Sequence, residues 1–377
     1  MSVGGVRPTD PPSSTVRTVT RTLPAQRIDG AAPMPPVQRL AGPSEEDWTR
    51  AVAAVRSLPA TAPILLACHV NPDGDALGSM LGFGLGLRRL GYAVVHASFP
   101  GPLEVPEPLR SLPGLDLLVA SSAVAPEPRL VLSFDAATPA RLGELALYLD
   151  AAPESIVLDH HASNAGFGRI NLVDPAAAAT AVLADGLLTR LDVPLDAEIA
   201  ECLYVALATD TGSFRFDSST PAVHAFAGRL IATGIAVGAI SRRVFDTRPY
   251  GAVRLFGEVL GRAELEPEAA GGRGLVWTYA TLTDLERHGQ RPYVLEALID
   301  SVRCVAEADV ACVVKQVRPA EWAVSLRSKG GVDVSRLAVA LGGGGHRLAA
   351  GFTAYGGLDD VLDALHWQLG LVTGAAA

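Results

Sequence analysis

Residues 64–79 have the sequence Ile-Leu-Leu-Ala-Cys-His-Val-Asn-Pro-Asp-Gly-Asp-Ala-Leu-Gly-Ser. The first five are apolar, which is typical of a short strand buried on both faces. A turn rich in Asn, Pro, Asp and Gly follows, and apolar side chains then recur at helical spacing over residues 76–90, before Gly91. The stretch therefore predicts a strand, a loop and a helix, which is the repeating unit of an open α/β sheet.

The alternation of strand and helix continues to about residue 247. Further buried strands are expected at residues 93–97, 130–134 and 155–158, and helices at residues 176–191, 197–209 and 221–233. Upstream, Ser44 is a plausible helix N-cap because three acidic residues follow it. We expect residues 44–247 to form an α/β domain that has a mostly parallel sheet with helices on both faces.

The remaining chain has a different pattern, and residues 248–260 are expected to form a linker helix. Strands are expected at residues 275–280, 311–317 and 322–327, and helices near residues 294–306 and 334–341. This mixture predicts a smaller α+β domain over residues 261–377. We expect the active site in the cleft between the two domains.

Composition limits the function classes. The chain is 49% hydrophobic and 19% charged, and it has no apolar run long enough to span a bilayer, so no membrane association is expected. Its four cysteines show no CxxC spacing and favour reduced core thiols in a cytoplasmic protein. Residues 1–43 are rich in Pro, Thr, Ser and Arg and have no apolar period. We expect this N-terminal extension to be disordered, and Met34 is an alternative start.

The charge of the chain restricts its partners. A formal net charge of −9 argues against binding of long duplex nucleic acid, which needs a broad basic face. An acidic protein can still bind a short anion at one site, especially where metal ions reverse the local charge. Small anionic substrates are therefore favoured.

Polar residues follow the predicted strands at the points where those strands end. After the first strand, His69, Asp73 and Asp75 lie on a turn that can point them into one volume. Cations would relieve the repulsion between the two carboxylates. The alternative is an Asx-type turn beside a hydrogen-bonded histidine, without any metal.

A second polar patch, Asp159, His160 and His161, ends the strand predicted at residues 155–158. Adjacent strand residues point to opposite faces, so the two histidines should have different roles, and Asp159 could orient a ligating imidazole. Asp135 and Asp210 each follow a long apolar stretch. Taken singly, either acid is more simply a cap or turn residue, and only the whole set indicates a metal site.

At these residues the sequence resembles the DHH phosphoesterase superfamily, over about residues 64–352. The motifs are HVNPDGDALGS at His69, the Asp135 segment ending in Arg-Leu-Gly, DHHASN at Asp159, and TDTG around Asp210. The resemblance is to the bacterial branch of nanoRNases, pAp phosphatases and cyclic-dinucleotide (c-di-AMP) phosphodiesterases.

The resemblance implies two Mn²⁺ ions, for which Mg²⁺ or Co²⁺ are possible substitutes. Asp135 would bridge the ions, one of which would also be held by His69 and Asp73 and the other by Asp75, His160 and Asp210. Carboxylates mixed with imidazoles, without a thiolate, suit this metal. His161 would stabilise developing charge or protonate the leaving oxygen, and Asp159 would be the second catalytic residue.

A further polar group lies in the C-terminal domain. Alternation over residues 322–327 places Ser325 and Arg327 on one polar face. The glycine run at residues 342–345 is most simply a helix C-cap followed by a loop, whose bare N–H groups can bind an anion. With His346 it resembles the GGGHxxAAG signature of the DHH-associated domain. The resemblance implies that the substrate phosphate is bound by Arg327 and an imidazolium at His346, together with Ser325, Gly344 and Gly345.

The implied activity is hydrolysis of short oligoribonucleotides, c-di-AMP and pApA to mononucleotides, and of pAp to AMP. The motifs do not separate these substrates. One alternative is a catalytically silent nucleotide-binding regulator on the same fold, which the full ligand set disfavours. Another is an inorganic pyrophosphatase or exopolyphosphatase, and a Ser-Arg-Lys-Lys-Gln type of motif that marks the pyrophosphatases is missing. The resemblance also suggests a homodimer.

Overall fold

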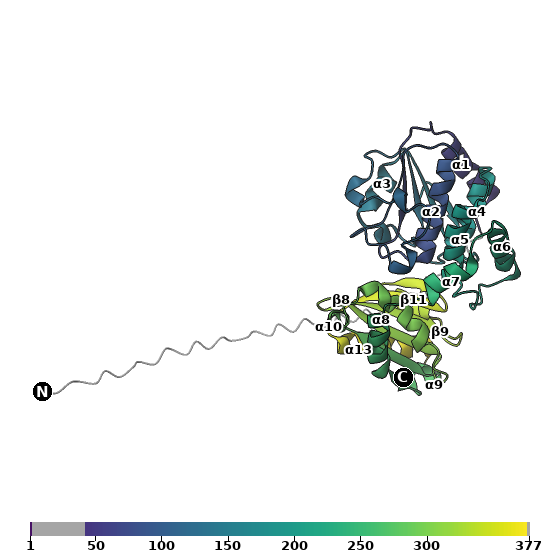
Figure 1. The fold of residues 1–377 in the computed structure, drawn as a ribbon. Helices are drawn as coiled ribbons and strands as arrows, with labels where there is room; N and C mark the ends of the chain where they lie inside the picture. Colours follow the sequence, from purple (N-terminus) through teal and green to yellow (C-terminus); the bar gives the residue numbers. More distant parts are fainter. Residues whose placement is uncertain (2–41, 375–377) are drawn as a thin grey trace, which may run out of the picture. The chain divides into compact units, whose positions relative to one another are not determined.

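The computed structural model describes residue 1 and residues 42–374 (Figure 1). The predicted N-terminal extension, with its alternative start at Met34, lies outside the described residues apart from its two ends. Ser44 is the N-cap of α1 (Glu45–Arg56). Its hydroxyl accepts a hydrogen bond from the backbone N–H of Asp47, whose carboxylate accepts one from the N–H of Ser44. This capping box confirms the predicted N-cap.

The first sheet has five strands within the described residues, in the order β2-β1-β3-β4-β5. They are β1 (Ile64–Cys68), β2 (Val95–Ser98), β3 (Leu130–Phe134), β4 (Glu154–Asp159) and β5 (Ile170–Val173). All the pairings are parallel, as predicted. β5 was not predicted, because a short strand that includes Asn171 has a weak strand signal. The parallel alignment places the carboxyl ends of β1, β3 and β4 side by side.

Helices cover both faces of this sheet, as predicted. One face packs against α1, α2 (Gly74–Arg89) and α4 (Thr180–Arg190), and the other against the 3-10 segment Pro139–Leu145 and α3 (Ala146–Ala151). α5 (Ala197–Asp210) packs mainly on α2 (Figure 1). The other elements of this part are α6 (Pro221–Ala232), α7 (Val237–Phe245) and the 3-10 turns Glu107–Leu109, Leu115–Leu117 and Ser121–Ala123. We call residues 44–247 the N-terminal lobe.

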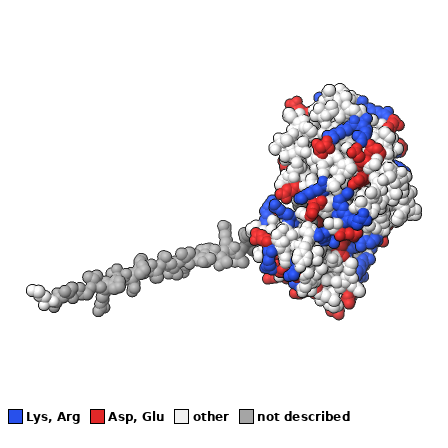
Figure 2. Space-filling view, in the orientation of Figure 1, with Lys and Arg blue, Asp and Glu red and all other residues white. Residues whose placement is uncertain are grey.

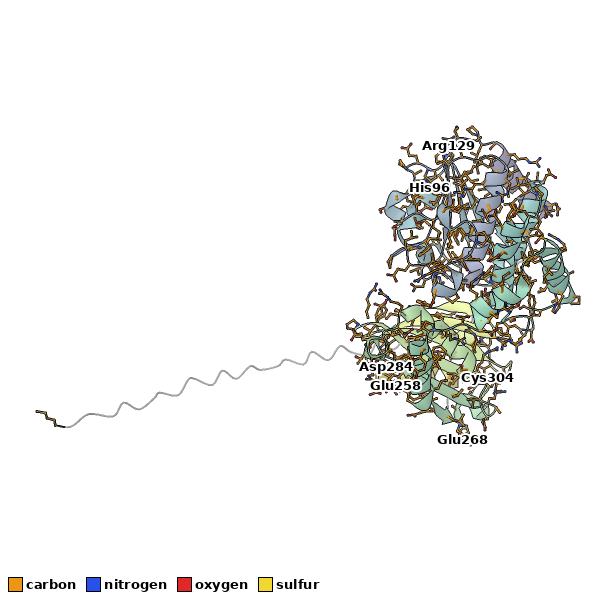
Figure 3. The ribbon with its side chains drawn as sticks, in the orientation of Figure 1. His96, Arg129, Glu258, Glu268, Asp284 and Cys304 are labelled. Atoms are coloured by element: carbon orange, nitrogen blue, oxygen red, sulfur yellow. The ribbon has the colours of Figure 1, made fainter. Side chains whose placement is uncertain are left out.

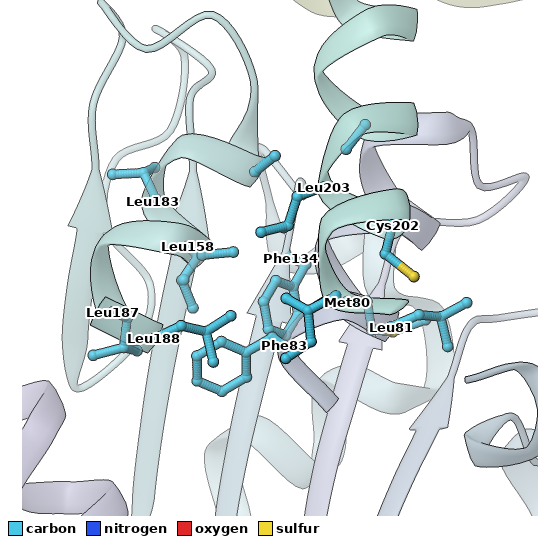
Figure 4. Packing of buried hydrophobic residues seen from close by; sticks show 14 of the residues in the cluster. Met80, Leu81, Phe83, Phe134, Leu158, Leu183, Leu187, Leu188, Cys202 and Leu203 are labelled. Atoms are coloured by element: carbon cyan, nitrogen blue, oxygen red, sulfur yellow. The ribbon is translucent and has the colours of Figure 1, made fainter. Parts of the chain in front are cut away.

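Large apolar side chains fill the space between the first sheet and α2 (Figure 4). The rings of Phe83 from α2 and Phe134 from β3 are fully buried, and their centroids are 5.6 Å apart. Leu158 of β4 and Leu203 of α5 belong to the same cluster. Because this core holds α2 against the strands, it also fixes the loop between β1 and α2, which carries the first predicted ligands.

Gly78 allows α2 and α5 to approach each other closely. A Cβ atom at this position would lie 2.4 Å from the carbonyl oxygen of Cys202 and 2.9 Å from Cβ of Ala206. We expect Gly78→Val to lower the free energy of unfolding by about 3 kcal/mol because it overpacks this contact. Urea denaturation measures the change. Gly228→Val on α6, where a Cβ would meet nothing within 4 Å, is the matched control. Equal unfolding midpoints for the two variants would contradict the close packing.

The C-terminal lobe, residues 248–374, is built on a second sheet with the strand order β10-β11-β9-β8-β7-β6. Its strands are β6 (Glu264–Glu266), β7 (Leu275–Ala280), β8 (Val310–Arg318), β9 (Glu321–Ser328), β10 (Gly344–His346) and β11 (Ala349–Tyr355). β7 and β8 pair in parallel and the other neighbours are antiparallel. The mixed sheet confirms the predicted α+β class of this part.

Two groups of helices cover the second sheet. One apolar cluster includes α12 (Val334–Ala340) and α13 (Leu358–Thr373), and the other includes α8 (Tyr250–Gly261), α10 (Leu282–Arg287) and α11 (Leu298–Val302). Two short elements are α9 (Ala269–Gly272) and the 3-10 segment Pro292–Ala297. The continuous helix predicted at residues 294–306 is therefore wrong, because a 3-10 segment precedes α11 and α11 ends at Val302.

The predicted linker helix corresponds to α8, which packs into the core of the C-terminal lobe. Oε2 of Glu258 on α8 lies 2.7 Å from Nε2 of His288, and Arg262 pairs with Asp284 at 3.1 Å. Glu258 and Asp284 lie close together in this lobe (Figure 3). These ion pairs hold α8 and α10 together. The domain boundaries at residues 247 and 260 stay a prediction.

Two expectations from composition can be compared with the described residues. Cys68, Cys202 and Cys312 are buried as expected, but Cys304 is exposed, because it lies in the turn that follows α11. No single helix in the described residues is long and apolar enough to cross a membrane. α6 and α7 meet that criterion only as a pair, bent by 114° at the break between them.

Candidate metal centre and active site

The junction of β1 and α2 carries three of the predicted ligands. His69 directly follows β1 and is buried. Asp73 is the N-cap of α2, and its carboxylate accepts a hydrogen bond from the N–H of Ala76. α2 begins at Gly74 rather than at the predicted residue 76, so Asp75 lies in the first helical turn. Nε2 of His69 is 3.9 Å from Oδ1 of Asp73.

Asp135 lies between two imidazoles at the end of β3. Its backbone is left-handed (φ 56°), which is uncommon for a residue other than glycine and is a form of strain found at functional sites. Its Oδ2 lies 3.3 Å from Nε2 of His69, and its Oδ1 lies 3.5 Å from Nε2 of His160. The two carboxylate oxygens thus face different histidines, as a bridging ligand requires.

The N-terminus of α4 holds two of the buried carboxylates. Asp75 accepts hydrogen bonds from the N–H of Thr180 (2.6 Å), the N–H of Ala181 (3.2 Å) and the hydroxyl of Ser79 (2.7 Å). The hydroxyl of Thr180 also donates to Oδ1 of Asp135 at 3.1 Å. Sequence reasoning missed Thr180, because the four alanines before it carry no polar signal.

His160 links Asp210 to this group. Its Nε2 lies 3.2 Å from Oδ2 of Asp210 and 3.7 Å from Oδ2 of Asp75. Its other ring nitrogen, Nδ1, lies 3.2 Å from the carbonyl oxygen of Ala177. Asp210 is the last residue of α5 and so ends a helix, whereas the other predicted acids follow strands or begin a helix. The structure therefore brings all six predicted ligands into one cluster.

His161 is held mainly by Asp159, although its Nδ1 also lies 3.6 Å from Oδ1 of Asp135. Its Nδ1 lies 2.7 Å from Oδ1 of the fully buried Asp159, whose Oδ2 accepts a hydrogen bond from Nδ2 of Asn164 at 2.6 Å. The expectation that His160 and His161 point to opposite faces is wrong, since their ring centroids are only 5.1 Å apart. β4 ends at Asp159, so strand alternation no longer applies to them.

The buried carboxylates of the cluster have shifted pKa values, and few positive charges lie near them. Burial and repulsion from Asp135 raise the pKa of Asp75 to about 8, and burial raises the pKa of Asp210 well above its usual value. Burial acts in the same direction on Asp135, but hydrogen bonds from His160 and His69 outweigh it and lower its pKa. The carboxylates therefore cannot all be ionised at neutral pH without added positive charge, which divalent cations would supply.

The donor atoms fit divalent cations in both position and chemistry. In each of two triplets, one ligand atom per residue lies within 4.8 Å of the others: His69 with Asp73 and Asp135, and Asp75 with Asp135 and His160. Cys68 directly precedes His69, but burial raises the pKa of its thiol well above the usual value and keeps it protonated. Imidazoles with carboxylates and no thiolate suit Mn²⁺ or Mg²⁺.

The C-terminal lobe contributes His346 to the same region. Its ring stacks on His161 with centroids 4.9 Å apart and an interplanar angle of 20°, and it lies 4.8 Å from the ring of His160. Burial and the two neighbouring imidazoles lower the pKa of His346 to about 3. This environment favours a neutral imidazole at His346 over the imidazolium that the sequence suggested.

Only the first half of the glycine run that precedes His346 is outside a regular element. Gly342 follows α12 with φ 81°, as a glycine after a helix often does, but residues 344–346 form β10 and pair with β11. A Cβ atom on Gly343 would lie 2.1 Å from the carbonyl oxygen of Gly351. The run therefore lets two strands approach closely, and the predicted loop is corrected to a strand at Gly344 and Gly345.

Arg327 and Ser325 share one face of β9, as the alternation predicted, while Val324 and Leu326 are buried on the other. Nη1 of Arg327 donates to the carbonyl oxygen of Leu326, and its buried Nε has no hydrogen-bond partner among the described residues. A buried N–H of this kind is available to a ligand. No described contact assigns a ligand to Ser325, Gly344 or Gly345.

Arg303 is a cation near this site that sequence reasoning missed. Its guanidinium lies 4.7 Å from the ring centroid of Phe216, in the segment that follows Asp210. It also pairs with Asp300 at 3.1 Å. Arg303 stands outside every quoted motif, and a single arginine after a short helix has no sequence signal of its own.

Two family models match this fold and site. The DHH family, N-terminal domain, matches residues 63–207, and the DHHA1 domain matches residues 277–369. The first range contains the ends of β1, β3 and β4, and the second contains β9 and β10. Together with the cluster of buried carboxylates and imidazoles, these matches define a phosphoesterase. The chain belongs to the DHH family.

Curated relatives and a solved structure agree with this class. The chain is 33% identical over 314 residues to the bifunctional oligoribonuclease and PAP phosphatase NrnA of Thermus thermophilus, covering 81% of this chain and 90% of that protein. It is 26% identical over 304 residues to the protein of the same name in Bacillus subtilis, covering 80% and 92%. An exopolyphosphatase-related protein from Bacteroides fragilis has the same fold, with a TM-score of 0.76 and 23% identity over 88% of this chain and 97% of that chain.

Proposed function

We propose that the protein is a Mn²⁺-dependent phosphodiesterase and phosphatase of very small nucleotides. Its substrates would be short oligoribonucleotides and linear and cyclic dinucleotides such as pApA and c-di-AMP, which it would hydrolyse to mononucleotides. It would also hydrolyse pAp to AMP. The observation that carries the proposal is the cluster of six imidazole and carboxylate donors that Asp135 joins, of which only Asp73 is exposed. The relatives named as oligoribonuclease and PAP phosphatase support the same substrate class.

The six donors would hold two cations. We assign His69, Asp73 and Asp135 to one ion, and Asp135, Asp75, His160 and Asp210 to the other. Two bound divalent cations screen the charge of a phosphate and lower the pKa of water. Thr180 donates hydrogen bonds to one oxygen of Asp75 and one oxygen of Asp135, and these bonds help to keep both carboxylates in place.

The other residues of the site would bind the substrate and transfer a proton to it. Asp159 fixes the orientation of His161, which leaves Nε2 of His161 to stabilise developing charge or to protonate the leaving oxygen. In the C-terminal lobe, we assign the substrate phosphate to Arg327 and His346, whose Nε atoms are buried and free of partners among the described residues. Ser325, Gly344 and Gly345 would complete this phosphate site.

Surface charge supports small substrates. Lys and Arg are interspersed with Asp and Glu over the visible face, without a continuous basic stripe on the described residues seen there (Figure 2). Long duplex nucleic acid needs such a surface to displace counterions from many phosphates. A short nucleotide needs only a few positive charges at one site, such as the guanidinium of Arg327.

A substrate panel tests the proposed function. Metal-free protein would be assayed for product release from pAp, pApA, c-di-AMP, a five-nucleotide RNA, pyrophosphate and long duplex RNA, with and without Mn²⁺. We expect Mn²⁺-dependent hydrolysis of the small nucleotides only. Binding without turnover at saturating Mn²⁺ would instead establish a regulator, and preferred cleavage of pyrophosphate would move the protein to another branch.

Arg327→Ala should mainly weaken substrate binding, because Arg327 lies outside the metal cluster. We expect KM for pAp to rise by about 30-fold or more, equivalent to about 2 kcal/mol, with a smaller change in kcat. Michaelis kinetics at saturating Mn²⁺ measures both parameters. Arg336→Ala, on the exposed face of α12, is the control and should behave as wild type. An unchanged KM in Arg327→Ala would contradict the phosphate site.

We also propose that the protein is a homodimer, on the basis of the family resemblance. We place it in the cytoplasm because none of its four cysteines is paired. Sedimentation equilibrium of the full chain measures the oligomeric state. A monomer at micromolar concentration would refute the dimer and would leave the proposed chemistry unchanged.

A further inference from the structure

Three histidines from the two lobes form a group of nitrogen donors beside the proposed catalytic centre. One ring nitrogen from each of His160, His161 and His346 lies within 4.8 Å of the other two. Their ring centroids are 5.1, 4.8 and 4.9 Å apart. Small shifts of the side chains would bring the three nitrogens around one ion, in the manner of three-histidine metal sites.

Hydrogen bonds on the outer side of two rings determine which nitrogen is available. Nδ1 of His161 lies 2.7 Å from a carboxylate oxygen of Asp159, and Nδ1 of His160 lies 3.2 Å from the carbonyl oxygen of Ala177. Histidines that bind zinc usually donate their other ring N–H to a carboxylate or a backbone carbonyl in this way. Both rings are therefore set to bind a metal through Nε2.

The third ring has a nitrogen that lacks a partner. Nε2 of His346 is buried and makes no hydrogen bond to any described residue. A buried polar atom without a partner is unfavourable and points to a ligand that is bound in another state of the protein. The backbone of His346 is fixed by the pairing of β10 with Ala349 of β11, so the position of this donor is defined.

We propose that His160, His161 and His346 form a zinc site that inhibits the enzyme. Three imidazoles, two of them supported by outer hydrogen bonds, suit Zn²⁺ better than Mn²⁺, which prefers a larger share of oxygen ligands. The C-terminal lobe supplies one ligand and the N-terminal lobe supplies two. Zinc binding therefore also joins the two lobes.

Inhibition follows because the same atoms serve both sites. Nε2 of His160 cannot bind zinc and the proposed Mn²⁺ centre at the same time. The zinc ion would also occupy His161 and His346, to which we assign proton transfer and phosphate binding. This consequence for activity rests on the proposed function, whereas zinc binding itself does not.

Metal binding by the full chain tests the site directly. Metal-free wild type, His346→Asn and His224→Asn would be titrated with Zn²⁺ against a chromophoric chelator. His224 lies on α6, outside the cluster, and is the matched control. We expect His346→Asn to lower zinc affinity by at least about tenfold, because it removes a direct ligand, and His224→Asn to leave it unchanged.

Zinc K-edge X-ray absorption at one equivalent of Zn²⁺ separates this site from the carboxylate-rich centre. Wild type should show three imidazoles around zinc, and His346→Asn should show two. Equal zinc affinities for wild type and His346→Asn, or fewer than three imidazoles in wild type, would overturn the proposal.

Zinc inhibition of pAp hydrolysis at saturating Mn²⁺ connects the site to activity. Each variant is compared with its own rate without zinc, because His346→Asn also changes substrate binding. We expect the zinc concentration for half inhibition to rise at least about tenfold in His346→Asn. Three-imidazole zinc binding in a protein without Mn²⁺-dependent turnover would refute the proposed function alone. An active enzyme whose zinc affinity is the same in wild type and His346→Asn would refute the zinc site alone.

Discussion

Asp135→Asn should lower Mn²⁺-dependent turnover at least about 10³-fold, equivalent to about 4 kcal/mol of transition-state stabilisation, while the protein stays folded. The two oxygens of Asp135 face different histidines, at 3.3 Å from His69 and 3.5 Å from His160. Asparagine keeps one oxygen and replaces the other with an NH₂ group, which cannot bind a cation. One of the two proposed ions must therefore lose its shared ligand.

The choice of asparagine separates metal binding from backbone strain. Asp135 has φ 56°, and asparagine adopts this left-handed conformation about as readily as aspartate does, whereas alanine adopts it less readily. Asp192→Asn is the matched control, because Asp192 is also left-handed (φ 62°) and is exposed, where it pairs with Arg56. Any loss that arises from the backbone alone should appear in both variants.

Metal content gives a second measurement for Asp135→Asn. Wild type should bind two Mn²⁺ per chain in equilibrium dialysis, and the variant should bind one or none at the same free concentration. Circular dichroism and the unfolding midpoint show whether the variant is folded. If folded Asp135→Asn kept turnover within tenfold of wild type and still bound two Mn²⁺, Asp135 would not be the shared ligand.

The first sheet and most of the site were predictable from local sequence, because short apolar strands ended by acids and histidines have a strong signal. The apolar run at residues 130–134, followed by Asp135, predicts both the strand and the acidic side chain at its end. The parallel sheet then brings the ends of β1, β3 and β4 together without any further information. Prediction succeeded where each residue's position followed from its own segment.

Contacts between distant segments were not predictable. Asp75 is held by the N–H groups of Thr180 and Ala181, and nothing in the sequence near Asp75 or near Thr180 indicates this contact. The glycine run at residues 342–345 was predicted as a helix C-cap followed by a loop, because glycine commonly follows the last turn of a helix. Gly344 and Gly345 instead pair with β11, and β11 approaches too closely for a Cβ atom at Gly343.

The histidine pair shows a third limit of sequence reasoning. Strand alternation predicts that His160 and His161 face apart, but it applies only while the strand continues, and β4 ends at Asp159. The length of the strand depends on its pairing with β3 and β5, since the last residue of β4 that pairs is Asp159, opposite Val173. The convergence of the two rings with His346 therefore required the tertiary structure.

His161→Ala should lower kcat for pAp by about 10²- to 10⁴-fold if His161 protonates the leaving oxygen. The leaving group of a nucleotide is a poor one that needs a proton, whereas p-nitrophenolate leaves without one. The loss should therefore be at most about tenfold on a p-nitrophenyl phosphate ester of the nucleotide. The alternative role, stabilisation of charge on the phosphate, predicts similar losses on both substrates, and that result would exclude proton transfer by His161.

The neighbours of His161 supply the controls for this test. Asp159 holds Nδ1 of His161 at 2.7 Å, so Asp159→Asn, which presents an amide in place of a pure acceptor, should disturb the orientation and tautomer of the ring. Its loss should depend on the leaving group in the same way and be smaller than that of His161→Ala. His224→Ala, on α6, should match wild type. Asp159 contacts the ring of His161 and not the ring of His160. Asp159→Asn should therefore leave the Mn²⁺ content at two ions per chain. This result would separate the proton-transfer residues from the metal ligands.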